Sequence, residues 1–115
     1  MPRFLCMYKS GKGESAPPSA EDQAKMGALI GEWVQAGVLL SAEGCMPSKF
    51  GFRIRQDNGT VTVTDGPFAE SKEIVGGFAI IQAASKEAAI PWIKKFLEVA
   101  GDGESEVRQL WDQEG

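Results

Sequence analysis

The chain has 115 residues, of which 43% are hydrophobic and 24% charged, a composition typical of a single globular domain. Its formal net charge is −4 and its lysines and arginines are scattered, which argues against direct nucleic acid binding. It contains no histidine and only two cysteines, so histidine-based catalysis is excluded, and we expect no disulfide framework, metal site or cofactor.

The first predicted element is a strand over residues 2–8 that is apolar on both faces. Phe4, Cys6 and Tyr8 alternate with Leu5 and Met7, so both faces of this strand should be covered. Because the chain enters the strand directly, it lacks the apolar block of a signal peptide, and its apolar runs are too short to span a bilayer. We therefore expect a cytoplasmic protein.

An amphipathic helix is predicted after a loop over residues 9–18 that is rich in glycine, serine and proline. Ser19 is its expected N-cap, with Asp22 three residues later in a box-like position, and Gly37 is its expected stop. Apolar residues recur at helical spacing and form one stripe: Met26, Leu29, Ile30, Trp33 and Val34. A second strand is predicted over residues 38–42, and Glu43 follows its end.

Residues 50–65 predict a β-hairpin around Asn58-Gly59, the preferred pair for a two-residue type I′ turn. This turn sets Ile54 opposite Val63 and Phe52 opposite Asp65. One face then carries Phe50, Phe52, Ile54, Val61 and Val63, and the other carries Arg53, Arg55, Thr62 and Thr64. Asp65 falls on the apolar side, which we expect to be covered, so that its carboxylate needs partners.

The last third of the chain predicts a strand, a helix and a strand. Residues 74–83 form the first strand, with Phe78 and Ile80 on one face and Ile81 on the other. Ser85 is the expected cap of the helix, and Pro91 predicts a kink or a later start of that helix. The final strand is predicted over residues 105–112.

The order of elements predicts an α+β fold of one domain, residues 1–115. Without the hairpin, the order is the βαββαβ repeat of the ferredoxin-like fold, with both helices on one face of an antiparallel sheet. The hairpin is then an insertion in that fold. Since two helices cover only one face, the apolar second face predicts a homodimer in which sheet packs on sheet.

Residues 65–73, DGPFAESKE, carry the densest unusual chemistry in the chain, and we call them the signature. Asp65-Gly66-Pro67-Phe68 reads as a turn on its own. Glu70, Lys72 and Glu73 add two carboxylates and an ammonium. If these groups converge, they can tune each other's pKa, as an acid–base site requires. The alternative is a solvated loop with a weak ion pair.

The signature resembles that of the DGPF proteins, a branch of the YCII-related domain family, whose pattern is DGPFAETKE. Ser71 stands where the pattern has threonine. Further segments that fit are Gly37-Val38-Leu39, Glu43-Gly44, Gly76-Gly77-Phe78 and Glu106-Val107-Arg108.

The resemblance implies a ferredoxin-like α+β fold that dimerises into an α/β barrel. It also implies association with an extracytoplasmic-function sigma factor, because members of the branch are often encoded beside one. Some members of the wider family are proposed to be enzymes through a His–Asp pair, which this chain cannot form because it has no histidine.

Three hypotheses about function follow, and no residue set assigns a reaction class. In the first, the protein binds or converts a small molecule in a pocket at the signature. In the second, it is an interaction module that serves a transcription regulator, and in the third the signature only maintains the fold and the dimer. A deep pocket containing Asp65 and Glu73 would favour the first, and an exposed apolar patch rimmed by charge would favour the second. The candidate ligand-binding residues are Asp65, Phe68, Glu70, Lys72, Glu73 and Glu43.

Overall fold

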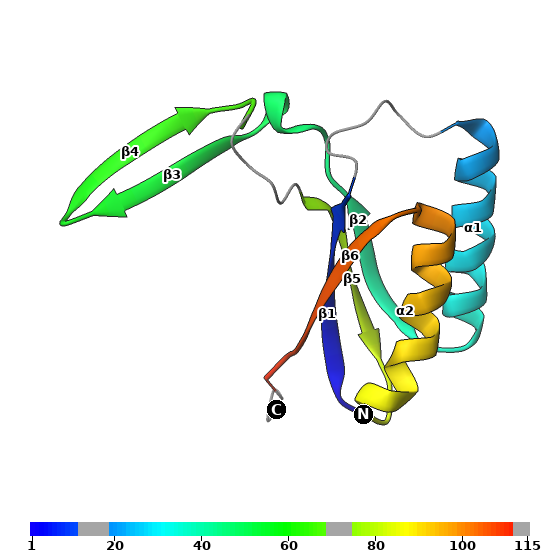
Figure 1. Ribbon diagram of the computed structural model, residues 1–115. Helices are drawn as coiled ribbons and strands as arrows, with labels where there is room; N and C mark the ends of the chain where they lie inside the picture. Colours follow the sequence, from blue (N-terminus) through cyan, green and yellow to red (C-terminus); the bar gives the residue numbers. More distant parts are fainter. Residues whose placement is uncertain (12–18, 69–74, 112–115) are drawn as a thin grey trace.

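Six strands, two α-helices and one short 3-10 helix make up the part of the chain that this computed structural model describes, residues 1–11, 19–68 and 75–111 (Figure 1). Their order is β1 (Arg3–Ser10), α1 (Ala20–Gln35), β2 (Leu39–Gly44), η1 (Ser48–Phe50), β3 (Phe52–Asp57), β4 (Thr60–Asp65), β5 (Val75–Gln82), α2 (Lys86–Ala100) and β6 (Gly103–Gln109).

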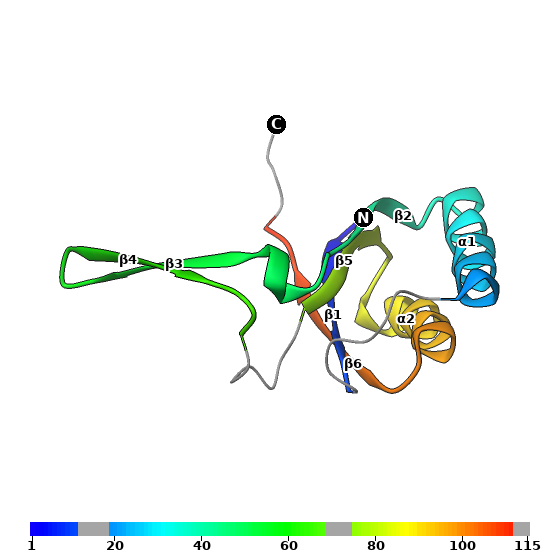
Figure 2. The ribbon, with the colours of Figure 1, turned by 90° about the horizontal axis from the view of Figure 1, so that it is seen from above.

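The main sheet has four strands in the order β2-β5-β1-β6, and every neighbouring pair is antiparallel. Strand β5 therefore lies between β1 and β2, and β1 lies between β5 and β6, an arrangement compatible with the split βαβ units of a ferredoxin-like fold. Both helices lie on the same side of this sheet (Figures 1 and 2). The predicted α+β class and the placement of the helices are confirmed.

Local capping interactions define the helix ends, largely as the sequence predicts. The Ser19 side chain accepts a hydrogen bond from the backbone N–H of Asp22 at 3.1 Å, and Ser85 accepts one from Ala88 at 3.1 Å. Each such cap stabilises a helix by about 1 kcal/mol. After α1 the chain takes a φ of 72° at Gly37, a left-handed conformation that suits glycine and ends the helix.

Of the two alternatives predicted from Pro91, a kink or a later start of the helix, the later start is wrong, because α2 begins at Lys86. Pro91 lacks the N–H that would bond to the Glu87 carbonyl in a regular helix. The cap at Ser85 and the burial of Ala89, which is 2% exposed, hold the first turn in place ahead of the proline. Neither helix is long and apolar enough to cross a membrane, as far as the described residues extend.

The core lies between the two helices and the facing side of the main sheet. Its buried members are Phe4, Cys6, Leu29, Trp33, Val38, Ile81, Ala83 and Ala89. Trp33 of α1 contacts Trp92 of α2 edge-on at a centroid distance of 6.5 Å, and Tyr8 of β1 contacts Phe96 at 5.4 Å. These aromatic contacts join both helices to each other and to β1.

The second face of the main sheet, which we call the open face, is turned away from the helices. In the register of β1 with β5, Leu5 pairs with Ile80 and Met7 pairs with Phe78. Paired residues of antiparallel strands point to the same side, and their neighbours Phe4 and Ile81 point into the core. The prediction that these strands are apolar on both faces is confirmed.

The hairpin β3–β4 forms a separate two-stranded sheet, residues 52–65, which we call the arm. Ile54 pairs with Val63 and Asp57 with Thr60, and the turn residues Asn58 and Gly59 have φ values of 49° and 82°, so the predicted two-residue turn and its register are confirmed. The arm projects from the main sheet on the side opposite the helices (Figures 1 and 2).

Strands β1, β2 and β5 begin and end within two residues of the predicted bounds, and the prediction that Glu43 follows its strand is wrong, because Glu43 lies within β2. Two other boundaries also need correction. Phe50 belongs to η1 instead of the hairpin, because its N–H donates to the Pro47 carbonyl in a tight turn. Strand β6 ends at Gln109 instead of residue 112, because its partner β1 begins at Arg3 and offers its last backbone contact to Leu110.

Candidate functional site

The base of the arm brings together η1, the start of β3 and the first residues of the signature. The N–H of Gly66 donates to the carbonyl oxygen of Gly51 at 3.0 Å. A Cβ at Gly66 would collide with the carbonyl oxygen of Ser48, so only glycine allows this close approach of the two segments. The glycine of the signature therefore has a structural role.

Phe68 also contacts the base of the arm, through both its backbone N–H and its ring. Its N–H donates to the Ser48 hydroxyl oxygen at 3.2 Å. The guanidinium carbon of Arg53 lies 3.9 Å from the centre of the half-buried Phe68 ring, a cation–π contact. We call Ser48, Gly51, Arg53, Gly66 and Phe68 the signature junction.

Asp65 lies opposite Phe52, as the register predicts, but its expected covering is wrong for the single chain. Asp65 is exposed, and so is every other residue of β3 and β4. The reason is that the arm forms its own sheet instead of extending the main one, so none of the other described strands and helices forms a second layer over its apolar face.

The remaining sequence-predicted site residues do not join the signature junction in the described structure. Glu70, Lys72 and Glu73 lie outside the described residues. Glu43 belongs to β2, where it is exposed and pairs with Phe78 of β5. Its backbone is tightly placed, since a Cβ on Gly77 would lie 2.7 Å from the Glu43 carbonyl oxygen.

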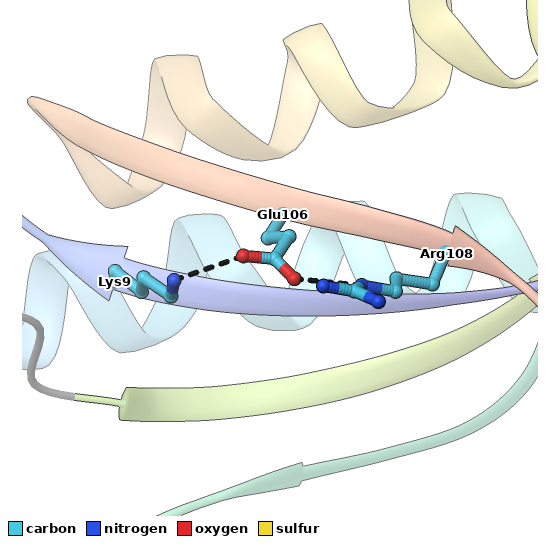
Figure 3. A network of polar contacts seen from close by, with 3 residues as sticks. All are labelled: Lys9, Glu106 and Arg108. Atoms are coloured by element: carbon cyan, nitrogen blue, oxygen red, sulfur yellow. Dashed lines mark hydrogen bonds and ion pairs between the residues drawn. The ribbon is translucent and has the colours of Figure 1, made fainter.

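The sequence analysis missed a polar network on the open face, which Lys9 of β1 forms with Glu106 and Arg108 of β6 (Figure 3). Glu106 of β6 accepts hydrogen bonds from Lys9 Nζ at 3.0 Å and from Arg108 Nε at 2.8 Å. These hydrogen bonds lower the pKa of Glu106 below its ordinary value, and the bond from Lys9 has the larger effect. The sequence held a signal for this network, because alternate residues of a strand lie on one face. Lys9 therefore lies on the same face of β1 as Leu5 and Met7, and these two pair with Arg108 and Glu106 of β6.

The open face therefore has an apolar centre and a charged rim. Its centre is formed by the half-buried side chains of Leu5, Met7, Phe78 and Ile80. The Lys9–Glu106–Arg108 network lies towards the β6 edge, and Glu43 lies on β2, at the other edge. An apolar patch with a polar rim is the anatomy of a protein contact surface.

The two thiols lie in different environments, and both are free. Cys6 is buried in the core, and this burial raises its pKa to about 11, which keeps it protonated and unreactive at neutral pH. Cys45 is exposed just after β2. Within the described part of the chain, no three His, Cys, Asp or Glu side chains gather in a way that could hold a metal ion.

Two comparisons with known proteins agree. The model of the YCII-related domain family matches residues 3–113. The chain is also similar to an uncharacterized protein of Rhizobium meliloti (strain 1021), with 33% identity over 110 residues that cover 92% of this chain and 88% of that protein. With nearly its whole length matched, the chain belongs to the YCII-related domain family.

Proposed function

We propose that this chain is a cytoplasmic protein-interaction module that works as a homodimer through its open face. The observation that carries the proposal is the apolar centre of that face, Leu5, Met7, Phe78 and Ile80, with charged groups at its rim. Both helices lie on the other side of the sheet and leave this centre for a partner. The two free thiols, Cys6 and Cys45, are in keeping with a reducing compartment.

A second copy fits this surface because a sheet face packs well on a like face. Two sheets stack about 10 Å apart with their side chains interdigitated. A two-fold axis brings the same patch of each copy together, so one self-complementary surface is sufficient. The dimeric α/β barrel implied by the resemblance is a dimer of this kind.

The test is the mass of the protein in solution, with one carboxylate added on either side of the sheet. Met7→Glu places a charge in the centre of the open face, and Ala28→Glu places one on the exposed side of α1 as the matched control. We expect dimers for the unchanged protein and for Ala28→Glu, and monomers for Met7→Glu. A monomer mass for the unchanged protein at tens of micromolar by light scattering contradicts the proposal.

A sigma factor of the extracytoplasmic-function class is the second candidate partner, and it rests on the resemblance. If it used the open face, it would compete with the second copy. Added sigma factor would then convert the homodimer into a mixed complex, and Met7→Glu would weaken both assemblies. A mixed complex that forms equally well with Met7→Glu would place the sigma factor elsewhere on the protein.

Small-molecule binding at the signature is the second candidate function. The observation that favours it is the convergence of Arg53, Phe68 and Ser48 at the signature junction, since a guanidinium on an aromatic ring offers both charge and a flat surface. In this proposal, Asp65 and Phe68 line the site with Glu70, Lys72 and Glu73, and Glu43 is a further candidate.

A panel of small carboxylate and aromatic metabolites tests this second candidate by thermal shift. A ligand of the junction raises the melting temperature of the unchanged protein but not that of Arg53→Leu. Arg55→Leu is the control, because Arg55 lies on the same face of the arm, two residues from Arg53. Equal shifts for both variants would remove the junction as the binding site.

A further inference from the structure

The apolar face of the arm is the most exposed hydrophobic surface that the described residues carry on a regular element. Phe52 and Ile54 are each 63% exposed, Val61 is 58% exposed and Val63 is 60% exposed. These four side chains leave on the order of 400 Å² of apolar surface in contact with water, a size that marks interaction sites. A lone two-stranded hairpin is only marginally stable in water, so the arm needs a surface to lie on.

The two faces of the arm differ in a way that fits burial of one face only. Arg53 pairs with Thr64 and Arg55 pairs with Thr62 on the side opposite the apolar residues. This polar side suits contact with water. The arm therefore has the alternation of a strand pair with one covered face, although all twelve residues of its strands are exposed and no described element of the same chain packs on it.

The arm also extends well beyond the rest of the chain. The radius of gyration is 16.0 Å, compared with roughly 13 Å for a compact domain of this length. A six-residue strand spans about 20 Å, whereas stacked sheets lie only about 10 Å apart. Since the arm projects on the side of the open face (Figures 1 and 2), it reaches past the first layer of any copy stacked there.

We propose that the apolar face of the arm packs on a second copy of this chain, so that two arms clasp the dimer reciprocally. The inference rests on the proposed homodimer and adds to it a contact surface outside the main sheet. Because each arm packs on the other copy, the same four residues become buried in both copies: Phe52, Ile54, Val61 and Val63.

The buried area distinguishes a second copy from an unrelated partner. One arm and the surface beneath it bury on the order of 800 Å², which is the size of a weak or crystal-packing contact. Two arms in a symmetric dimer bury on the order of 1,600 Å², which is the size of a standard specific interface. A symmetric dimer therefore doubles the buried interface area with the same residues of the arm, and this favours a second copy as the partner.

Paired substitutions on the two faces of the arm test the clasp. Ile54→Ser with Val63→Ser removes a directly opposed apolar pair, and Arg55→Ser with Thr62→Ser removes a directly opposed pair from the polar face. We expect the dissociation constant of the dimer, measured by analytical ultracentrifugation, to rise roughly a hundredfold or more for the first variant. For the second it should change by less than about threefold, since exposed polar side chains contribute little.

Amide hydrogen exchange of residues 52–65 provides a readout without substitution. In a clasped dimer these amides exchange slowly, and dilution below the dissociation constant makes them exchange fast. Fast exchange at all concentrations, or an unchanged dissociation constant for Ile54→Ser with Val63→Ser, overturns the clasp and leaves the homodimer standing. A protein that is a monomer at every concentration overturns the homodimer itself, and the clasp with it.

Discussion

The carbonyl oxygen of Ser48 occupies the space that a Cβ on Gly66 would need. The backbone of the signature and that of η1 touch at this point, where the chain returns from the arm. Two of the four described residues of the signature, Gly66 and Phe68, thus hold the base of the arm in place, which means that the arm's direction depends on them.

Gly66→Ala should loosen the base of the arm. The new methyl group forces the two backbones apart, and overpacking of this kind costs about 1–3 kcal/mol. We expect amide exchange of residues 52–65 to become faster while that of β1 and β5 stays the same, because the main sheet does not depend on this contact. Gly31→Ala in α1 is the control: its Cβ meets nothing within 4 Å, and the helix should gain about 0.5–1 kcal/mol. Unchanged exchange in the arm of Gly66→Ala would show that the junction does not hold it.

Arg53 and Phe68 should be coupled in a double-mutant cycle. Their contact at 3.9 Å is partly exposed, and such cation–π pairs contribute about 0.5–1 kcal/mol. Arg53→Leu and Phe68→Leu are each expected to lower the free energy of opening the arm, measured by amide exchange of residues 52–65. The double variant should lower this free energy by less than the sum of the two single effects. The cycle between Arg55→Leu and Phe68→Leu serves as the control, with no coupling expected. Strict additivity of Arg53→Leu and Phe68→Leu would remove the stacking contact from the account of the junction.

Glu106 should make the stability of the protein depend on pH in the acidic range. Hydrogen bonds from Lys9 and Arg108 lower its pKa in the folded state below the unfolded value. The contribution is therefore present above the unfolded pKa and is lost as the pH falls through the folded pKa. Urea unfolding between about pH 7 and pH 3 should show a shallower loss of stability for Glu106→Gln than for the unchanged protein. Arg108→Leu should fall between the two, since Lys9 remains. Parallel pH profiles for all three proteins would contradict the role of this network.

Cys6 and Cys45 should differ in their reaction with iodoacetamide. Cys45 is exposed, whereas burial raises the pKa of Cys6 to about 11 and shields its sulfur. Mass spectrometry at pH 8 should find one modified thiol in the folded protein and two in urea. Since the folded pKa of Cys6 is raised, its protonated form contributes stability that is lost as the pH rises from the unfolded value of 9.0 towards 11. Fast modification of Cys6 in the folded protein would show that the core opens readily.

The residues near one another in sequence determined most of the elements of this fold. Ser19 and Ser85 cap the helices, Asn58-Gly59 turns the hairpin, and alternation sets the register that pairs Ile54 with Val63. Each of these features depends on steric and hydrogen-bonding preferences within a few residues, which a sequence displays directly.

Only the tertiary structure decided where the arm points and what meets at its base. The sequence predicted an apolar face on the hairpin but not that no other described element packs on this face, because covering depends on whether β3 and β4 join the main sheet. In the same way, Arg53 reaches Phe68, and Lys9 reaches Glu106, across long separations in the chain. Contacts of this kind follow from how the elements are placed in space, and local preferences do not encode that placement.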